Sequence, residues 1–178
     1  MGGEGFLPIF VVIWNEYMLT LSVSIEKQTL VVRSHQTIIK SYRISTAKLG
    51  VGEIKNSEKT PRGQHLIRAK IGKDCPINTV FVGRRPTGEI FHPALRLQYP
   101  NRDWILTRIL WLSGLEVGKN RLHDRDTMRR YIYIHGSPDD VVMGLPGSRG
   151  CIRMHNHDIL ELFQLIPVGT LITINEKN

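Results

Sequence analysis

Three short strand patterns near the start of the chain restrict most strongly what it can fold into. Residues 21–25, 29–34 and 37–45 are rich in β-branched side chains and alternate partly between apolar and polar positions. Only two or three residues separate each pattern from the next. Such short breaks are typical of hairpins and meanders, so we expect the three segments to pair antiparallel.

Further strand patterns follow a polar, glycine-containing loop at residues 48–63. Residues 65–72 resume an extended pattern, and the apolar run at 104–112 fits a buried strand and a helix nearly equally well. We expect a strand at 104–112, because the run is nine residues long and rich in β-branched and aromatic side chains. Two more strands are expected at 131–134 and at 171–174.

One definite helix is expected at residues 156–166, where Pro167 terminates it. Its apolar side chains recur on one face: Ile159, Leu162, Phe163 and Ile166. We expect Asn156 to cap this helix, with Asp158 in the first turn, where the helix dipole favours a negative charge. The pattern as a whole predicts a mainly β domain, a sandwich or barrel-like sheet with one helix after residue 151.

Size, composition and charge are those of one folded domain. The chain has 178 residues, of which 41% are hydrophobic, enough for a single core. Its formal net charge of +8 indicates attraction to anionic partners, but the basic residues are scattered, with their longest cluster at 84–86. Aromatic residues are few and are not interleaved with them, as a single-strand binder would need. No nucleic-acid partner is expected, whereas a peptide or polymer that carries carboxylates fits the charge.

The N-terminal segment is predicted to lie outside the domain. Residues 6–14 are apolar but too few to span a bilayer, so no stable membrane span is expected. Residues 1–5 carry no positive charge, and no cleavage-site pattern follows. A strand pattern opens at Met18. We therefore divide the chain into an N-terminal extension or degenerate export signal at 1–17 and a domain at 18–178.

A histidine and a cysteine stand in short glycine-rich turns within residues 131–154, YIYIHGSPDDVVMGLPGSRGCIRM. A nearby imidazole can take the proton of a thiol, and an adjacent glycine lets a substrate carbonyl approach the backbone amides. We expect both side chains to be exposed, with Cys151 as nucleophile and His135 as the base that later returns the proton to a leaving amine. Turn amides at 149–151 could form an oxyanion hole.

These residues resemble the active-site signature of the L,D-transpeptidase (YkuD-type) catalytic domain. The resemblance rests on His135-Gly136, fifteen residues between His135 and Cys151, and the segment 148–154, SRGCIRM. The turn at 60–63, TPRG, gives weaker support, since it is also a plain β-turn pattern. The resemblance implies acyl transfer from the L,D-bond of a peptidoglycan tetrapeptide stem, through a thioester, to an amine or to water.

The resemblance also implies roles for single residues. The Gly136 carbonyl would orient the ring of His135, and Arg153 would grip a substrate carboxylate with its planar fork of donors. Ser148 is assigned to substrate binding. Backbone support of the oxyanion is assigned to three residues: Arg149, Gly150 and Gly136. No cofactor and no metal are implied, and the substrate places the protein in the cell envelope or periplasm, although the cytoplasm stays open without a clear signal peptide.

Arg149 departs from the family pattern, which usually has histidine at this position. A fixed positive charge two residues from Cys151 would favour the thiolate, but the replacement is equally what a weakened enzyme would show. Two alternatives therefore stay open. One is a non-catalytic module that binds a wall polymer or peptide, and the other is a cysteine amidase or peptidase with a different substrate.

Other polar residues have simpler interpretations. A zinc site from Cys151, His155 and His157 is less economical than a helix entrance at these positions, and Cys75 fits an ordinary turn. Asp139 and Asp140 are better explained as turn formers after a proline than as acids. The remaining histidines show no pairing pattern and fit solvated or hydrogen-bonded loop positions: His35, His65, His92 and His123.

Overall fold

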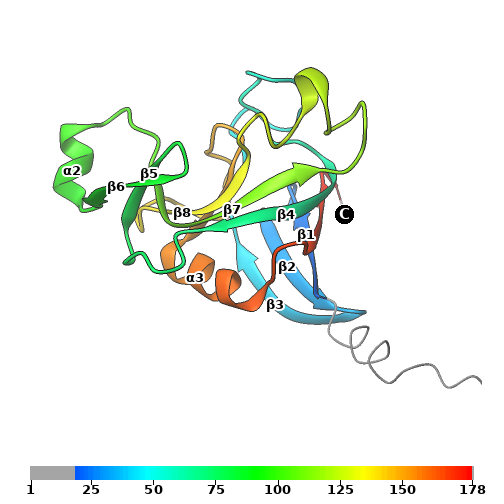
Figure 1. Cartoon of the computed structure of the whole chain (residues 1–178), viewed down its shortest axis with the longest axis horizontal. Helices are drawn as coiled ribbons and strands as arrows, with labels where there is room; N and C mark the ends of the chain where they lie inside the picture. The colour runs from blue at the N-terminus through cyan, green and yellow to red at the C-terminus, as the bar shows by residue number, and fades with distance from the viewer. Residues whose placement is uncertain (1–18, 178) are drawn as a thin grey trace, which may run out of the picture.

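The computed structural model describes residues 19–177, so the predicted N-terminal extension lies outside the described residues. A curled ten-stranded sheet organises this part of the chain (Figure 1). The strands are β1 (Leu19–Ser24), β2 (Thr29–Ser34), β3 (Thr37–Arg43), β4 (Gly63–Ile71), β5 (Thr79–Val82), β6 (Arg85–Ile90), β7 (Ile105–Gly114), β8 (Tyr133–Ser137), β9 (Ile152–His155) and β10 (Leu171–Asn175). The helices are α2 (Pro93–Gln98), a short 3₁₀ turn (His123–Arg125) and α3 (Asn156–Leu165).

The three N-terminal strands pair antiparallel, as predicted. Leu21 lies opposite Val32, and Val31 lies opposite Ser41. The first strand also pairs in parallel with β10, which lies between β1 and β4. The C-terminal strand therefore joins this meander to the rest of the sheet.

Strand β7 pairs with three other strands and confirms the strand predicted at 104–112. It pairs antiparallel with β4, β5 and β8. Most of its side chains are buried. Burial on both faces explains why apolar residues stand at consecutive positions of this strand rather than at alternate ones, although buried Thr107 and Arg108 interrupt the run.

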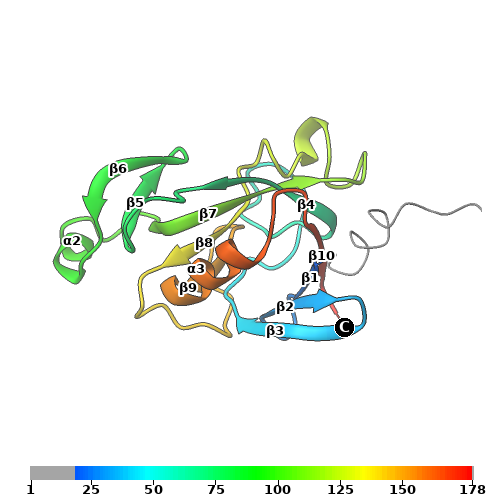
Figure 2. The same cartoon turned by 60° about the horizontal axis from the view of Figure 1, so that its bottom comes forward.

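Helix α3 packs inside the curl of the sheet, against β7, β8 and β9 (Figure 2). Ile159, Leu162 and Phe163 belong to the main core, together with Leu30 and Val32 of the opposite side of the curl. The predicted apolar stripe is therefore the face that closes the core. This packing holds β8 and β9, the two strands that flank the glycine-rich motif, against a rigid support.

The predicted cap of this helix is wrong. The N-cap residue is His155, without a side-chain cap, and Asn156 is the first helical residue. Asn156 is buried, because its amide is turned inward to bind Thr107, Asn78 and the carbonyl of Ser137. Asp158 does lie in the first turn of the helix, as predicted.

Strands β5 and β6 and helix α2 form an arm that projects from the body of the molecule (Figures 1 and 2). A small apolar cluster of Val80, Trp104 and Leu106, with Phe91 and Leu95 packed against it, joins the arm to β7. The sequence patterns predicted no element in this region. Helix α2 buries none of its residues, so it carries no periodic apolar stripe.

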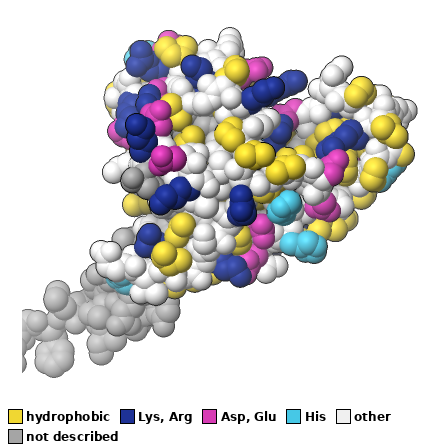
Figure 3. All heavy atoms as spheres, turned by 180° about the vertical axis from the view of Figure 1, so that it is seen from behind, with side chains coloured by type: hydrophobic (Ala, Val, Ile, Leu, Met, Phe, Trp, Pro, Cys, Tyr) yellow, Lys and Arg dark blue, Asp and Glu magenta, His cyan; other side chains and the backbone are white. Residues whose placement is uncertain are grey.

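Charges are dispersed on the face drawn in Figure 3, where Lys and Arg side chains alternate with Asp and Glu. Among residues 19–177, no helix has the length and apolar content needed to cross a membrane.

Candidate active site

Cys151 immediately precedes β9, which pairs in parallel with β8, the strand that carries His135. In this pairing Ile152 lies opposite Ile134, and Arg153 lies opposite His135. The residues between the cysteine and the histidine thus connect two adjacent strands. The fold brings the predicted nucleophile and base into one neighbourhood.

His135 is fully buried, which corrects the expected surface position. Strand β8 lies between β7 and β9 rather than at an edge, and all five of its residues are buried. The ring is held by its neighbour, since Nδ1 lies 2.7 Å from the carbonyl oxygen of Gly136, as the resemblance implied. A proton donated from Nδ1 to that carbonyl leaves a lone pair on Nε2.

The free Nε2 of His135 is suited to accept a proton. It has no hydrogen-bond partner among the described residues. Burial lowers the pKa of the imidazole, although the charge of Asp103 and the Gly136 carbonyl oppose the shift. Burial therefore favours the neutral ring. A buried polar atom without a partner is uncommon and costly; His135 Nε2 is one of four such side-chain atoms among the described residues.

Cys151 is partly buried rather than openly exposed. Its Sγ accepts a hydrogen bond from the backbone N–H of Tyr133 at 3.4 Å, and its S–H donates to the carbonyl of Tyr131 at 3.5 Å. Burial raises the pKa of the thiol to about 12, although the Tyr133 amide and nearby arginines oppose the shift. In the described structure the thiol makes no hydrogen bond to His135.

The loop that precedes Cys151 is held by Ser148. Its Oγ donates to the Cys151 carbonyl at 2.5 Å and accepts from the Gly150 N–H at 3.2 Å. Ser148 is buried and its hydroxyl supports the loop, while the substrate-binding role expected for it stays a prediction. The Gly150 amide is occupied, which leaves the amides of residues 149 and 151 as candidates for an oxyanion hole.

The TPRG segment at 60–63 forms no β-turn, contrary to the pattern, but runs into β4 at Gly63 and is tied to the same loop. Thr60 is fully buried, and its Oγ1 accepts from the Ala47 N–H at 3.0 Å and donates to the Gly150 carbonyl at 2.9 Å. Gly150 has a φ of +124°, a conformation that favours glycine. The hydroxyl of Thr60 therefore fixes the backbone one residue before Cys151.

Arg153 is engaged by the protein itself. Its Nη2 forms an ion pair with Asp103 at 2.8 Å, and its Nη1 donates to the Gly147 carbonyl at 3.0 Å. A substrate carboxylate at this position would have to compete with Asp103. Asp103 lies just before β7, where an isolated acid gives no spacing signal, and the sequence patterns did not identify it.

A cavity of about 490 Å³ opens onto Cys151. Its charged and aromatic lining comprises Arg84, Asp103, Arg130, Arg149, Tyr131 and Tyr133. Arg130 is tied down, since it donates to the carbonyls of Gly52, Glu53 and Lys59. The thiol thus faces a hollow large enough for a short peptide segment, with arginines around it.

Residues 20–174 match the L,D-transpeptidase catalytic domain. The chain belongs to this family. It is 27% identical over 154 residues to YkuD of Bacillus licheniformis, a match that covers 86% of this chain and 64% of that relative. A shorter match of 47 residues to YkuD of Bacillus subtilis is 45% identical and covers 26% of this chain and 29% of the relative.

The fold is shared with solved members of the family. An L,D-transpeptidase structure from Mycobacterium smegmatis superposes with a TM-score of 0.54 at 17% identity, covering 89% of this chain and 58% of that one. The mainly β architecture with one main helix is thereby confirmed. This chain spans 64% or less of the length of the three relatives compared.

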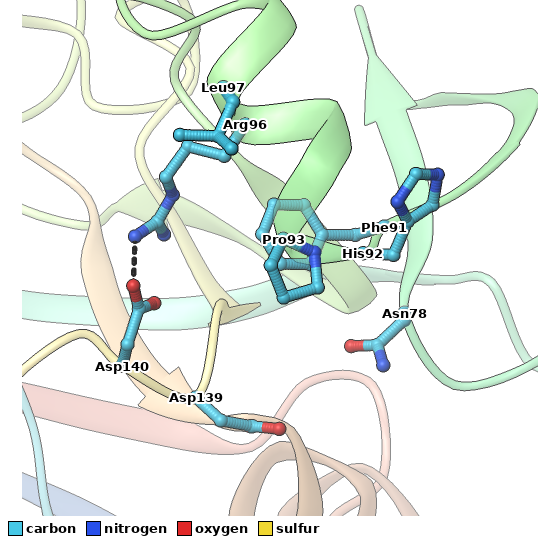
Figure 4. A pocket seen from close by; sticks show the side chains of 8 residues that line it. All are labelled: Asn78, Phe91, His92, Pro93, Arg96, Leu97, Asp139 and Asp140. Carbon is cyan, nitrogen blue, oxygen red and sulfur yellow. Dashed lines mark hydrogen bonds and ion pairs between the residues drawn. The ribbon is translucent and has the colours of Figure 1, made fainter.

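A second cavity of this transpeptidase-family chain lies beside α2 (Figure 4). Its lining includes Asp139 and Asp140, the residues interpreted as turn formers. Asp140 pairs with Arg96 across the cavity, and Asp139 accepts a hydrogen bond from Asn156. Neither aspartate lines the cavity of the thiol.

The described residues contain no group of three or more histidine, cysteine or acidic side chains placed to hold a metal ion. The zinc alternative with Cys151, His155 and His157 therefore lacks a supporting cluster. Cys75 is a partly buried free thiol, as expected for a turn residue. His65 differs from the expected loop position, because it is fully buried in β4.

Proposed function

We propose that this chain is a cysteine-dependent L,D-transpeptidase domain that acts on peptidoglycan stem peptides. The observation that supports this most is His135, whose ring is fixed by the Gly136 carbonyl while its buried Nε2 stays without a partner. The strand that follows Cys151 pairs directly with the strand of His135. Family membership supplies the substrate class.

In the proposed reaction the Cys151 thiol leaves the Tyr131 carbonyl and transfers its proton to Nε2 of His135. The thiolate sulfur then attacks the carbonyl carbon of the L,D-bond, and turn amides next to Cys151 stabilise the oxyanion. His135 returns the proton to the leaving amine, and the acyl group remains on the sulfur as a thioester.

The second half of the proposed reaction uses the same base. An acceptor amine attacks the thioester carbonyl while Nε2 of His135 takes its proton, and the Cys151 sulfur leaves and is reprotonated. The product is a cross-link when the acceptor is a neighbouring stem. Water as acceptor gives L,D-carboxypeptidase activity instead.

Three arginines have distinct places in this proposal. Arg149 lines the cavity of the thiol and would add a fixed positive charge there, and Arg130, which also lines it, lowers the thiol pKa. Arg153 acts in the same direction and would bind a substrate carboxylate in exchange for Asp103. Together they would favour the thiolate once substrate displaces water.

We place the action of this domain, residues 18–178, in the cell envelope, where stem peptides are found. The proposed substrate, not the described structure, is the reason for this location. Residues 1–17 are proposed as an extension or degenerate export signal.

A non-catalytic peptide-binding module is the second candidate. It is favoured by the absence of a thiol–imidazole hydrogen bond in the described structure and by the burial that raises the pKa of Cys151. Such a module would bind stem peptides without turnover. Replacement of Cys151 by alanine would leave its affinity unchanged.

The experiment that separates the candidates uses two tetrapeptide donors that differ only in the stereochemistry of the scissile bond. Purified chain and its Cys151→Ala variant are incubated with the L,D- and the L,L-peptide, with and without an amine acceptor, and products are measured by chromatography. We expect cross-linked or hydrolysed product only when the wild type is incubated with the L,D-peptide. Cleavage of the L,L-peptide would support a general cysteine peptidase, and binding without product would support the module.

A further inference from the structure

The hairpin turn between β5 and β6 places an arginine on the wall of the thiol cavity. Val82 pairs with Arg85, so Gly83 and Arg84 form a two-residue turn. Both turn residues have positive φ, +54° and +66°, as in a type I′ turn. The tight turn fixes the position from which the Arg84 side chain extends.

The guanidinium of Arg84 is stacked on aromatic rings rather than paired with an acid. Its Cζ lies 4.6 Å from the ring centroid of Trp111 and 4.7 Å from that of Tyr131. Its Nη1 donates to the hydroxyl of Tyr133 at 2.9 Å. Within residues 19–177 it forms no ion pair, so its remaining donors have no acidic partner.

The cavity around the thiol carries an excess of positive charge. Arg84, Arg130 and Arg149 line it, whereas its one acid, Asp103, is paired with Arg153. The donors of Arg130 are occupied by backbone carbonyls. Arg84 is therefore the cavity arginine that is both held in place and free of an anionic partner.

We infer that Arg84 binds a carboxylate of the acyl donor and makes the site selective for anionic donors. This inference rests on the proposed function, which supplies the acyl donor. A guanidinium fork matches a carboxylate in shape and charge, and stacking on two rings limits the entropy lost on binding. Conversion of that carboxylate to a carboxamide removes the charge and should weaken recognition.

The test uses a panel of tetrapeptide donors in which each free carboxylate outside the scissile bond is converted to a carboxamide, one at a time. The rate of acyl-enzyme formation is measured for wild type, Arg84→Gln, Arg84→Lys and Arg85→Gln. Arg85 is the exposed neighbour and does not line the cavity, so Arg85→Gln removes the same charge as a control. The same peptides are titrated calorimetrically into Cys151→Ala with and without Arg84→Gln.

For wild type and Arg85→Gln we expect one amidation to slow acylation on the order of 10- to 100-fold, as loss of a charge-assisted hydrogen bond predicts. The ratio of the acylation rates of the unmodified and the amidated peptide should fall to within about 3-fold of unity in Arg84→Gln. In Arg84→Lys this ratio should lie between those of wild type and Arg84→Gln, because lysine keeps the charge but not the planar fork of donors. Unchanged discrimination in Arg84→Gln, or none in wild type, would overturn the inference.

The calorimetric arm separates this inference from the proposed function. Binding that weakens on amidation in an Arg84-dependent way, without any acyl-enzyme, would support carboxylate recognition while refuting the transpeptidase proposal. If the acyl-enzyme forms and its discrimination against amidated donors does not depend on Arg84, carboxylate recognition is refuted while the transpeptidase proposal stands.

Discussion

At the level of single residues, Cys151 and His135 both occupy settings that oppose their charged forms. Burial raises the thiol pKa to about 12 and lowers the imidazole pKa. Both shifts favour the neutral forms, so we predict a neutral resting pair rather than a preformed thiolate.

This setting predicts slow alkylation of Cys151 in the absence of substrate. At pH 8 a thiol of pKa about 12 is almost entirely protonated, so iodoacetamide should react on the order of 100-fold more slowly, or slower still, than with an unperturbed thiol of pKa about 8.5. Peptide mapping follows Cys151 and Cys75 separately, and Cys151→Ala assigns the signals. Rapid alkylation of Cys151 with a midpoint near pH 7 would contradict a neutral resting pair.

At the level of elements, Thr60 connects the segment before β4 to the loop before β9. Replacement of Thr60 by valine keeps the shape but leaves the Ala47 N–H and the Gly150 carbonyl without their partner. We expect the free energy of unfolding to fall by about 1–3 kcal/mol and acylation to slow about 10-fold or more, because the backbone beside the nucleophile is released.

Thr60→Ser is the matched control, since it keeps the hydroxyl and loses only a methyl group. Chemical denaturation and the rate of acyl-enzyme formation are measured for both variants. If the valine variant is as stable and as active as the serine variant, Thr60 does not position the loop.

At the level of the whole molecule, two buried histidines link stability to pH. His65 is held between the Gly63 carbonyl and Thr127, and burial lowers its pKa to about 4; burial lowers the pKa of His135 as well. The unfolded chain binds these protons near pH 6.5, before the folded chain does. The contribution of these histidines to the free energy of unfolding is therefore fully present above about pH 6.5 and is lost as the pH falls toward 4.

For His65 alone, the free energy of unfolding falls by about 3 kcal/mol as the pH falls from about 6.5 to about 4. We expect His65→Gln to show a smaller decrease in unfolding free energy between pH 7 and pH 4.5 than wild type, measured by denaturant titration. His123→Gln changes an exposed histidine and should behave as wild type. An equal pH dependence in wild type and His65→Gln would show that another group is responsible.

Local patterns predicted the parts of the fold that depend on local signals. The three N-terminal strands, the strand at 104–112 and the helix at 156–166 all carry such patterns. The glycine-rich motif and the family resemblance together predicted Cys151 and His135 as nucleophile and base. The arm from β5 to α2 was missed because α2 buries no residue. The parallel pairing of β8 with β9 was not predicted either, since no helix connects them.

The surroundings of the site depend on tertiary contacts that sequence spacing does not encode. Arg84, Asp103 and Arg130 come from separate turns and meet only at the cavity. The burial of His135 follows from the position of β8 inside the sheet, and the inward turn of Asn156 follows from three partners distant in sequence.

The most direct test of acyl transfer through Cys151 is the intact mass of the protein after mixing with an L,D-tetrapeptide donor. We predict a tripeptidyl adduct on the wild type that is absent from Cys151→Ala, is strongly reduced in His135→Gln, and disappears when an amine acceptor is added. If the folded wild type, with its thiol shown to be reduced, acquires no adduct and yields no product, the proposed function is contradicted.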